Sequence, residues 1–369
     1  MKQRVIQGVL FFLTLITTTL AGAEWQFGRY VGLDEHPLTW EYFWRGMWFS
    51  IPLLGFLTVH EFGHYFTALR HRVRVTLPYY IPLWLGFIFA PTIGTMGAVI
   101  RIKDAISTRQ KYFDIGIAGP LAGFVVALGV LFYGFTHLPP PEYIYEIHPE
   151  YEQYGLDYAQ HVYDQPESLY LGTTLLFEFF KHYVAAPEQV PNAYELFHYP
   201  WLFAGFLSLF FTALNLIPIG QLDGGHILYG LIGYQQHRRV SAVLFIAFMT
   251  YAGLGVVTPA MDMDSLLWGI PLYGGFLYVA LSKLTPRPLT NLMIASSVLV
   301  SQFLLAAWIP TITGYPGWLL FGFLIGRVLG VYHPRAMYDQ PLDTRRKVLG
   351  WLALVIFVLC FSPSPFVIE

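Results

Sequence analysis

The segment HEFGH, residues 60–64, carries two histidines four positions apart, with a glutamate directly after the first. On an α-helix, positions i and i+4 share a face, so His60 and His64 would present their imidazoles together. Two imidazoles on one helical turn can bind a zinc ion, and the adjacent Glu61 can then reach a water molecule at the metal. The spacing therefore predicts half of a zinc site, and the chain's low histidine content, 12 in 369 residues, disfavours a chance pentapeptide.

The residues that surround this motif are apolar. The chain is 55% hydrophobic and 12% charged, whereas soluble domains carry about 25% charged residues. Ionisable side chains inside a bilayer are costly and are therefore usually functional. The formal net charge of −2 provides no basic surface for phosphates, so we expect no nucleic-acid partner.

Apolar runs of about 20 residues, enough for a helix to cross a bilayer, recur along the chain. We expect an all-α polytopic membrane protein with nine transmembrane helices, near residues 5–23, 45–69, 113–136, 200–219, 240–257, 265–283, 289–309, 316–332 and 348–364. The first run follows Lys2 and Arg4 and ends at Ala21-Gly22-Ala23, a pattern also found in cleaved signal peptides. We expect a retained helix, and with either outcome residue 24 emerges outside.

Short loops rich in Lys and Arg face the cytoplasm. Basic clusters at 70–74 and 101–111 place both ends of the segment between them on that side, so residues 77–100 cannot cross the membrane completely. The segment is interrupted by prolines and glycines, which a straight helix does not tolerate well. We expect a re-entrant segment that packs against the other helices.

Three regions are expected along the chain: an N-terminal helix with its exoplasmic link (1–44), a catalytic membrane core (45–239) and C-terminal helices (240–369). Within the core, residues 137–199 form an acidic, Tyr- and Pro-rich stretch with a single lysine, Lys181. The predicted topology places this insertion outside, and a short helix is expected around 168–182.

A catalytic zinc ion usually has three protein ligands and one position for water. Asp223 is the best candidate for the third, because it follows the 200–219 span and precedes two glycines that allow close backbone approach. It would lie at a depth similar to that of His60 and His64. A turn or helix-capping role is the alternative for Asp223. Asn215 is either a buried amide near Pro218 or a group that faces substrate, and His226 is a spare ligand or an interfacial histidine.

These residues together resemble the site-2 protease family of intramembrane zinc metalloproteases, peptidase family M50. The matching elements are HEFGH, the pattern N-x-x-P-x-x-x-x-D-G from Asn215 to Gly224, and the run IAGPLAGFVVALG at 117–129. The segment from Gly94 to Gly97 also resembles the family's re-entrant β-hairpin. The similarity covers about residues 45–230. No PDZ or CBS module is recognisable, so the chain is most similar to the PDZ-less branch that includes plant chloroplast members.

The resemblance implies that His60, His64 and Asp223 bind Zn²⁺ and that Glu61 is the general base. It also implies that Asn215, Gly94 and Gly97 contact the substrate. The expected activity is hydrolysis of peptide bonds within or near transmembrane segments, as in regulated intramembrane proteolysis. The expected partners are the lipid bilayer and single-pass or short transmembrane proteins. The expected location is a bacterial inner membrane, with the active site toward the cytosol.

Two other functions are compatible with a cluster of this kind. A metal transporter could use it as a transit site, although no inverted repeat is visible and the C-terminal helices carry few ionisable groups. A proteolytically inactive homologue could retain it as a membrane-binding protein, but such a protein would have no need for Glu61. The sequence predicts neither the substrate nor the oligomeric state.

Overall fold

The computed structural model describes residues 2–31, 37–88, 90–163 and 169–368. These residues divide into two compact units that alternate along the chain. The first unit comprises Met1–Ile106, Ala118–Leu214 and Val355–Glu369, and the second comprises Ser107–Ile117 and Asn215–Leu354. The expected domain boundaries at 44 and 239 stay predictions.

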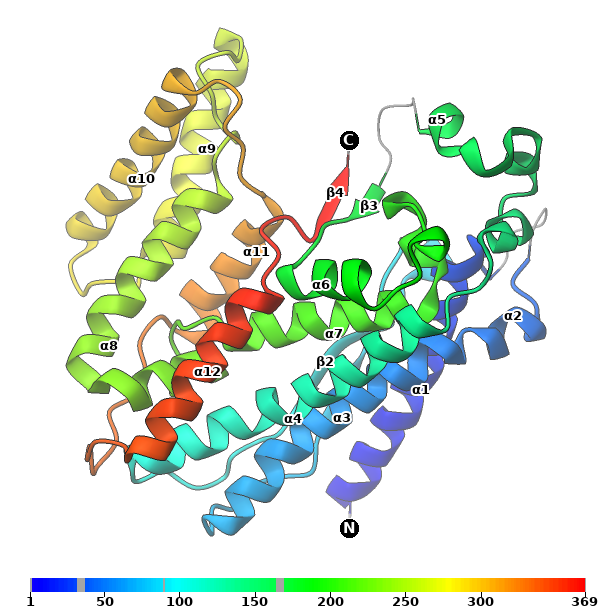
Figure 1. Cartoon of the computed structure of the whole chain (residues 1–369). Helices are drawn as coiled ribbons and strands as arrows, with labels where there is room; N and C mark the ends of the chain where they lie inside the picture. Colours follow the sequence, from blue (N-terminus) through cyan, green and yellow to red (C-terminus); the bar gives the residue numbers. More distant parts are fainter. Residues whose placement is uncertain (1, 32–36, 89, 164–168, 369) are drawn as a thin grey trace. The chain divides into compact units, whose positions relative to one another are not determined.

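Long apolar helices form most of the first unit (Figure 1). They are α1 (Lys2–Phe27), the short α2 (Trp40–Arg45), α3 (Met47–Arg70), α4 (Arg109–Thr136) from residue 118 onward, and α7 (Pro200–Leu216) as far as residue 214. The side chains of α7 are buried continuously from Leu202 to Leu209. A helix that is apolar on all sides belongs in the interior, so α7 forms the core of this unit.

Small and hydroxyl residues join α1 to α3. Thr18 and Ser50 share a hydrogen bond of 2.5 Å between their hydroxyl oxygens, and both side chains are buried. A Cβ on Gly22 would lie 2.8 Å from the Cβ of Phe49, so the two helix backbones approach closely at this point. Small residues permit this kind of close helix contact in membrane proteins.

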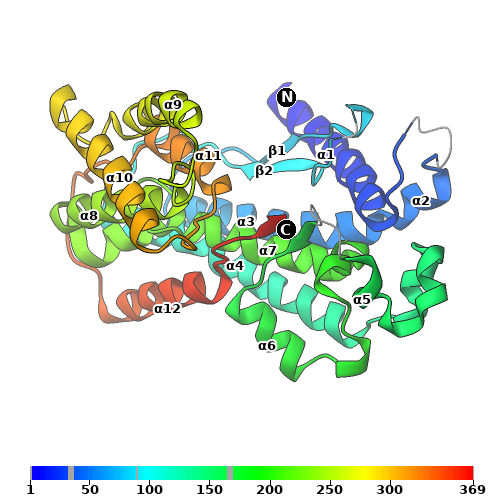
Figure 2. The same cartoon turned by 90° about the horizontal axis from the view of Figure 1, so that it is seen from above.

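Among its described residues, the segment 77–100 forms a β-hairpin and no α-helix. Strand β1 (Tyr79–Pro82) pairs antiparallel with β2 (Thr95–Val99), and the short 3₁₀ helix η1 (Gly86–Ile88) lies between them. Figure 2 shows the hairpin beside α1. Gln7 Nε2 donates to the Leu77 carbonyl at 2.6 Å, and Thr17 Oγ1 donates to the Gly94 carbonyl at 2.7 Å. The expected re-entry into the membrane stays a prediction, and Phe89 lies outside the described residues.

The insertion 137–199 consists of short, irregular elements with one longer helix. These are η2 (Pro141–Glu146), η3 (Pro149–Asp157), α5 (Ala159–Val162), β3 (Leu169–Leu171), α6 (Leu175–Tyr183), η4 (Pro187–Gln189) and η5 (Ala193–His198). The short helix expected around 168–182 therefore begins only at Leu175. Strand β3 pairs with β4 (Phe366–Ile368), which the sequence did not predict. Residues 164–168 lie outside the described part of the insertion.

The second unit is also helical. Besides the first residues of α4 it contains α8 (Asp223–Ala252), α9 (Met263–Leu281), α10 (Pro288–Trp308), α11 (Gly317–Leu324), which continues as the π-helix η6 (Ile325–Leu329), and α12 (Thr344–Cys360) as far as residue 354. Arg238 and Arg239 lie inside α8, which begins before the span expected from residue 240. The helical residues continue past Gly233, whose φ of 78° permits a local break without ending the element.

A helix lies at each of the nine expected spans, but four of the described helices are long and apolar enough to cross a membrane: α1, α4, α9 and α10. Helix α3 is not among these four because its polar motif lowers the hydropathy, and α7 and α12 are not because each has only 17 residues. The total of nine therefore stays a prediction. The all-α expectation holds for most of the chain, with two small two-stranded sheets as the exceptions.

Gly94→Ala should weaken the contact between the hairpin and α1. Gly94 has a φ of 80°, and a Cβ there would overlap the backbone of Thr18, so alanine introduces both strain and a clash costing about 1–3 kcal/mol. We expect a lower melting temperature in detergent. Gly8→Ala is the control because Gly8 lies in α1 with no atom within 4 Å of a Cβ. Equal melting temperatures for the two variants would contradict this packing.

Candidate metal centre

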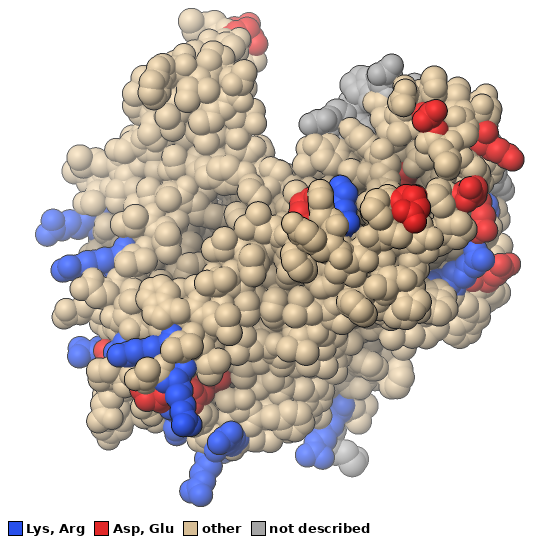
Figure 3. All heavy atoms as spheres, viewed as in Figure 1, with Lys and Arg blue, Asp and Glu red and all other residues tan. Residues whose placement is uncertain are grey.

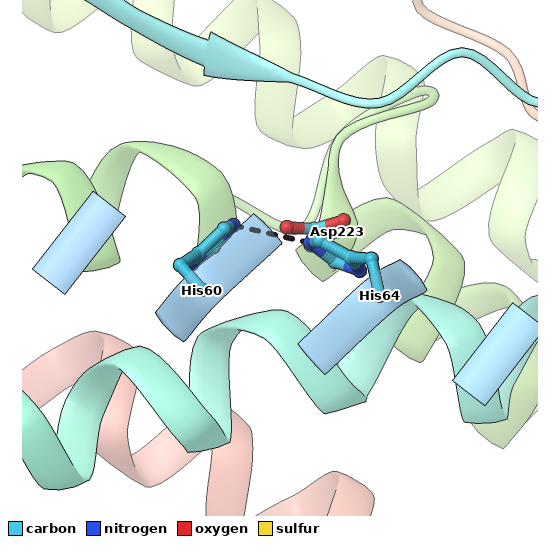
Figure 4. A group of neighbouring side chains, drawn as sticks. All are labelled: His60, His64 and Asp223. Atoms are coloured by element: carbon cyan, nitrogen blue, oxygen red, sulfur yellow. Dashed lines mark hydrogen bonds between the residues drawn. The ribbon is translucent and has the colours of Figure 1, made fainter. Parts of the chain in front are cut away.

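His60 and His64 lie on the same face of α3, as the spacing predicts. Their Nε2 atoms are 3.1 Å apart, and both side chains are buried. The two rings meet edge to face, with centroids 4.8 Å apart. Figure 4 draws these two imidazoles together with Asp223.

Glu61 accompanies the pair on the next position of the helix. Glu61 is 7% exposed, and its Oε1 lies 4.0 Å from the Nε2 of His60. A carboxylate at this distance lies beside the two imidazoles, where it can accept a proton from a water molecule close to them. The three residues therefore form the buried polar group that the motif predicts.

Helix α4 provides the surface on which the two imidazoles lie. A Cβ on Gly119 would overlap the His64 ring, and a Cβ on Gly123 would lie 3.1 Å from the Cβ of His60. On the α3 side, a Cβ on Gly63 would lie 2.6 Å from the Ala118 carbonyl oxygen. Glycine is thus required on both helices for this close approach. The run 117–129 is the part of the sequence that supplies the α4 glycines.

The geometry of this pair fits a zinc ion. Zn²⁺ binds imidazole nitrogen at about 2.0–2.1 Å in a tetrahedral arrangement, which separates adjacent ligand atoms by about 3.3 Å. The observed Nε2–Nε2 separation of 3.1 Å is close to this value. The glycines of α4 keep the space beside both rings free of side-chain atoms that would displace them.

The β-hairpin is attached to α3 next to the motif. Thr58, two positions before His60, shares a hydrogen bond of 2.7 Å with the hydroxyl of Tyr80 on β1. The two predicted glycine sites differ: Gly94 packs against α1, whereas Gly97 on β2 has a φ of 100° and no atom within 4 Å of a Cβ. A Cβ at Gly97 would therefore meet no other atom, although the residue itself is buried.

The chain entering the hairpin is tied to the chain leaving it by an ion pair. Arg74 donates from its backbone nitrogen and from Nε to the carboxylate of Asp104, at 2.8 Å each. These hydrogen bonds lower the pKa of the Asp104 carboxyl. Residues 75 and 102 form a β-bridge beside this pair, so the hairpin has a fixed base.

Asp223 is the first residue of α8, in the second unit, and is half-buried. A carboxylate is favoured there by the helix dipole. The following glycines admit the preceding loop, because a Cβ on Gly224 would lie 2.7 Å from the Ile217 carbonyl oxygen. Ser241 holds the same loop by accepting from the Gly220 backbone nitrogen at 3.0 Å. Asn215 lies in the last turn of α7 and is half-buried.

His226 belongs to a polar cluster in the second unit that the sequence did not predict. Its Nδ1 lies 2.7 Å from the Nε2 of His333, and its ring stacks on Tyr112. Next to them, Tyr229 donates to Asp339 at 3.1 Å. His226 and His333 are 107 positions apart, so no local pattern joins them.

Comparison with known proteins adds independent evidence. The sequence model of peptidase family M50 matches residues 48–256, more than half of the chain, and includes HEFGH and the pattern around Asp223. The chain belongs to peptidase family M50. No solved structure matches it.

Several plant proteins are similar to this family member. It is 26% identical over 309 residues to "Probable zinc metalloprotease EGY1, chloroplastic" of Arabidopsis thaliana, covering 78% of this chain and 48% of that protein. It is 28% identical to the EGY1 protein of Oryza sativa subsp. japonica, covering 65% and 35%, and 26% identical to the EGY2 protein of Oryza sativa subsp. indica, covering 54% and 31%. The chain thus spans half or less of the length of these relatives.

The family and the apolar helices show that this M50 peptidase is a membrane protein. The expected bacterial inner membrane is not supported, because the similar proteins are named as chloroplastic.

Gly119→Ala should displace the His64 ring, because the added Cβ overlaps that imidazole. We expect about 10-fold or greater loss of zinc affinity, measured by the zinc that the α3 site retains in the presence of a competing chelator. Gly129→Ala is the matched control on the same helix, since no atom lies within 4 Å of its Cβ. Unchanged zinc affinity in Gly119→Ala would show that α4 does not support the imidazoles.

Proposed function

We propose that the chain is an intramembrane zinc metalloendopeptidase that hydrolyses peptide bonds within or near the transmembrane segments of other membrane proteins. The observation that carries this proposal is the pair of buried imidazoles on α3, 3.1 Å apart beside Glu61, in a member of peptidase family M50. The relatives named as probable zinc metalloproteases support the same chemistry.

We propose His60, His64 and Asp223 as the metal ligands. Two imidazoles and one carboxylate are a common ligand set for catalytic zinc, and they leave a position open. Asp223 is the first residue of a helix, and the next two residues are glycines, so no bulky side chain follows its carboxylate. Zinc would supply Lewis acidity there, polarising a peptide carbonyl and making water acidic enough to attack at neutral pH.

Glu61 carries out the proton transfers in this scheme. As a carboxylate it takes a proton from the attacking water, and it returns a proton to the leaving amine when the peptide bond breaks. Its burial beside His60 keeps it in a position where both transfers occur at one centre. Asn215 is proposed to hold the substrate or the developing oxyanion through its amide donors.

The hairpin provides a means of presenting an extended substrate. Strand β2 pairs with β1 on one side, and among the described residues no strand pairs with its other edge. An extended peptide can add to a free strand edge through backbone hydrogen bonds. The exposed side chains of Met96 and Val99 on β2 fit this role. Substrates with Gly, Pro or Asn near the cut would unwind most easily.

The charge distribution supports an active site near the basic side of the membrane. His60 and His64 lie in the last third of α3, which ends at Arg70 and is followed by Arg72 and Arg74. The N-terminus of α1, with Lys2 and Arg4, lies at the same end of the first unit, and Figure 3 shows acidic side chains gathered over the insertion. Basic residues mark the cytoplasmic side of membrane proteins.

Two substitutions separate the proposed roles. Glu61→Gln should retain zinc and lower cleavage by about 10²-fold or more, because it removes the general base but not a ligand.

Asp223→Ala should lower both zinc content and cleavage, because it removes a ligand. Both are measured on the full chain in proteoliposomes, with metal analysis and cleavage of a single-pass substrate.

Asp262→Asn is the control, because Asp262 is an exposed helix N-cap whose capping bond asparagine can also make. Unchanged cleavage in Glu61→Gln would contradict proteolysis at this centre and favour a transporter or a binding protein. Normal zinc content in Asp223→Ala would exclude that residue as a ligand.

A further inference from the structure

A second group of potential metal ligands lies in the insertion, apart from the α3 motif. It consists of His148, between η2 and η3, and of Glu195 and His198 on η5. In a 3₁₀ helix, side chains at i and i+3 lie above one another, so the sequence ELFH presents Glu195 and His198 on one face. The loop that precedes η3 brings His148 to that face.

The three donor atoms converge. His148 Nε2 and His198 Nε2 are 3.3 Å apart, and the Oε2 of Glu195 lies 3.3 Å from His198 Nε2 and 3.9 Å from His148 Nε2. Tetrahedral zinc with bonds of about 2.0–2.1 Å separates its ligand atoms by about 3.3 Å. Two of the three separations equal this value, and the third exceeds it by a few tenths of an ångström.

Each of these three residues has its other polar atom engaged elsewhere. His148 Nδ1 bonds to Glu150 at 3.0 Å, and His198 Nδ1 bonds to the Gln26 backbone carbonyl at 2.8 Å. Tyr163 donates its hydroxyl to the Oε1 of Glu195. This is the arrangement in which metal-bound histidines are held by carboxylates and carbonyls.

These outer bonds fix the state of the inner atoms. A carbonyl oxygen or a carboxylate can only accept, so each Nδ1 carries a proton and each Nε2 is the ring nitrogen that faces inward. Two ring nitrogens and a carboxylate oxygen then face one another, and a cation between them can be coordinated by all three.

We propose that His148, Glu195 and His198 form a second divalent-metal site, suited to Zn²⁺, on the exoplasmic insertion. Imidazole and carboxylate ligands of this kind suit zinc and neighbouring transition metals. Glu195 is buried, and the His148 side chain is 29% exposed, which provides a route for the ion from solvent. With three protein ligands among the described residues, the ion retains a position for water or for an exogenous group.

The site would fasten the insertion to the end of α1. Gln26, whose carbonyl holds His198, also donates its side chain to the hydroxyl of Tyr143 at 2.8 Å, and Tyr143 donates in turn to the His198 carbonyl at 3.1 Å. Trp25 stacks on Phe197 with centroids 4.8 Å apart. An ion bound here therefore closes a network that already joins the two segments. This inference does not rest on the proposed proteolysis.

The test uses the full chain, purified without a polyhistidine tag, in a His60→Ala/His64→Ala background that removes the α3 ligands. After equilibration with zinc chloride and dialysis, we expect about one zinc ion per chain. Adding His148→Ala/His198→Ala should abolish this zinc. His161→Ala/His182→Ala, which changes two exposed histidines of the same insertion, should leave it in place.

A milder variant guards against misfolding. Glu195→Gln retains the shape of the side chain and its contact with Tyr163, yet it removes the anionic ligand. In the His60→Ala/His64→Ala background it should lower the zinc content by about one ion per chain and remove the rise in melting temperature that zinc produces. A His60→Ala/His64→Ala protein that folds but holds no zinc would overturn the proposal. Equal zinc loss in the His161→Ala/His182→Ala control would do the same, since it would indicate non-specific binding.

Discussion

The close contact between α3 and α4 is the constraint on which the rest of the centre depends. Imidazoles are bulky, and a pair of them can lie buried between helices only if the facing helix lacks side chains at the points of contact. Gly119 and Gly123 meet this condition on α4, and Gly63 meets it on α3. The same three positions let the backbones approach, so the proposed metal binding and the helix packing rest on one set of residues.

The surrounding elements follow from this contact. The hairpin is attached to α3 through Thr58 and Tyr80, and to α1 through Thr17 and the backbone of Gly94. Its base is fixed by Arg74 and Asp104. A strand edge held this firmly beside a buried polar centre is a suitable support for an extended substrate. In this proposal the chemistry is placed by helices, and the substrate is presented by a strand.

Local patterns predicted the α3 motif and the interruption at 77–100, because i, i+4 spacing and Pro/Gly content act within a few residues. Contacts between distant segments were not predictable. The pairing of β3 with β4, the bond from His226 to His333, and the meeting of His148 with His198 join positions that are far apart in the chain. The beginning of α8 at Asp223, well before the span expected from residue 240, was also not predicted. The substrate contact of Gly94, which the family resemblance implies, stays a prediction, and the structure shows this residue packed against α1.

The position of the cut bond tests the central claim most directly. A single-pass substrate is reconstituted with the enzyme in proteoliposomes, and the products are mapped by mass spectrometry. If hydrolysis occurs inside the bilayer, the new termini should lie within the apolar transmembrane segment of the substrate. They should fall in the third of that segment that is nearest its basic flank, because His60 and His64 lie in the last third of α3, next to its basic end. Termini confined to the water-exposed flanks would contradict intramembrane cleavage.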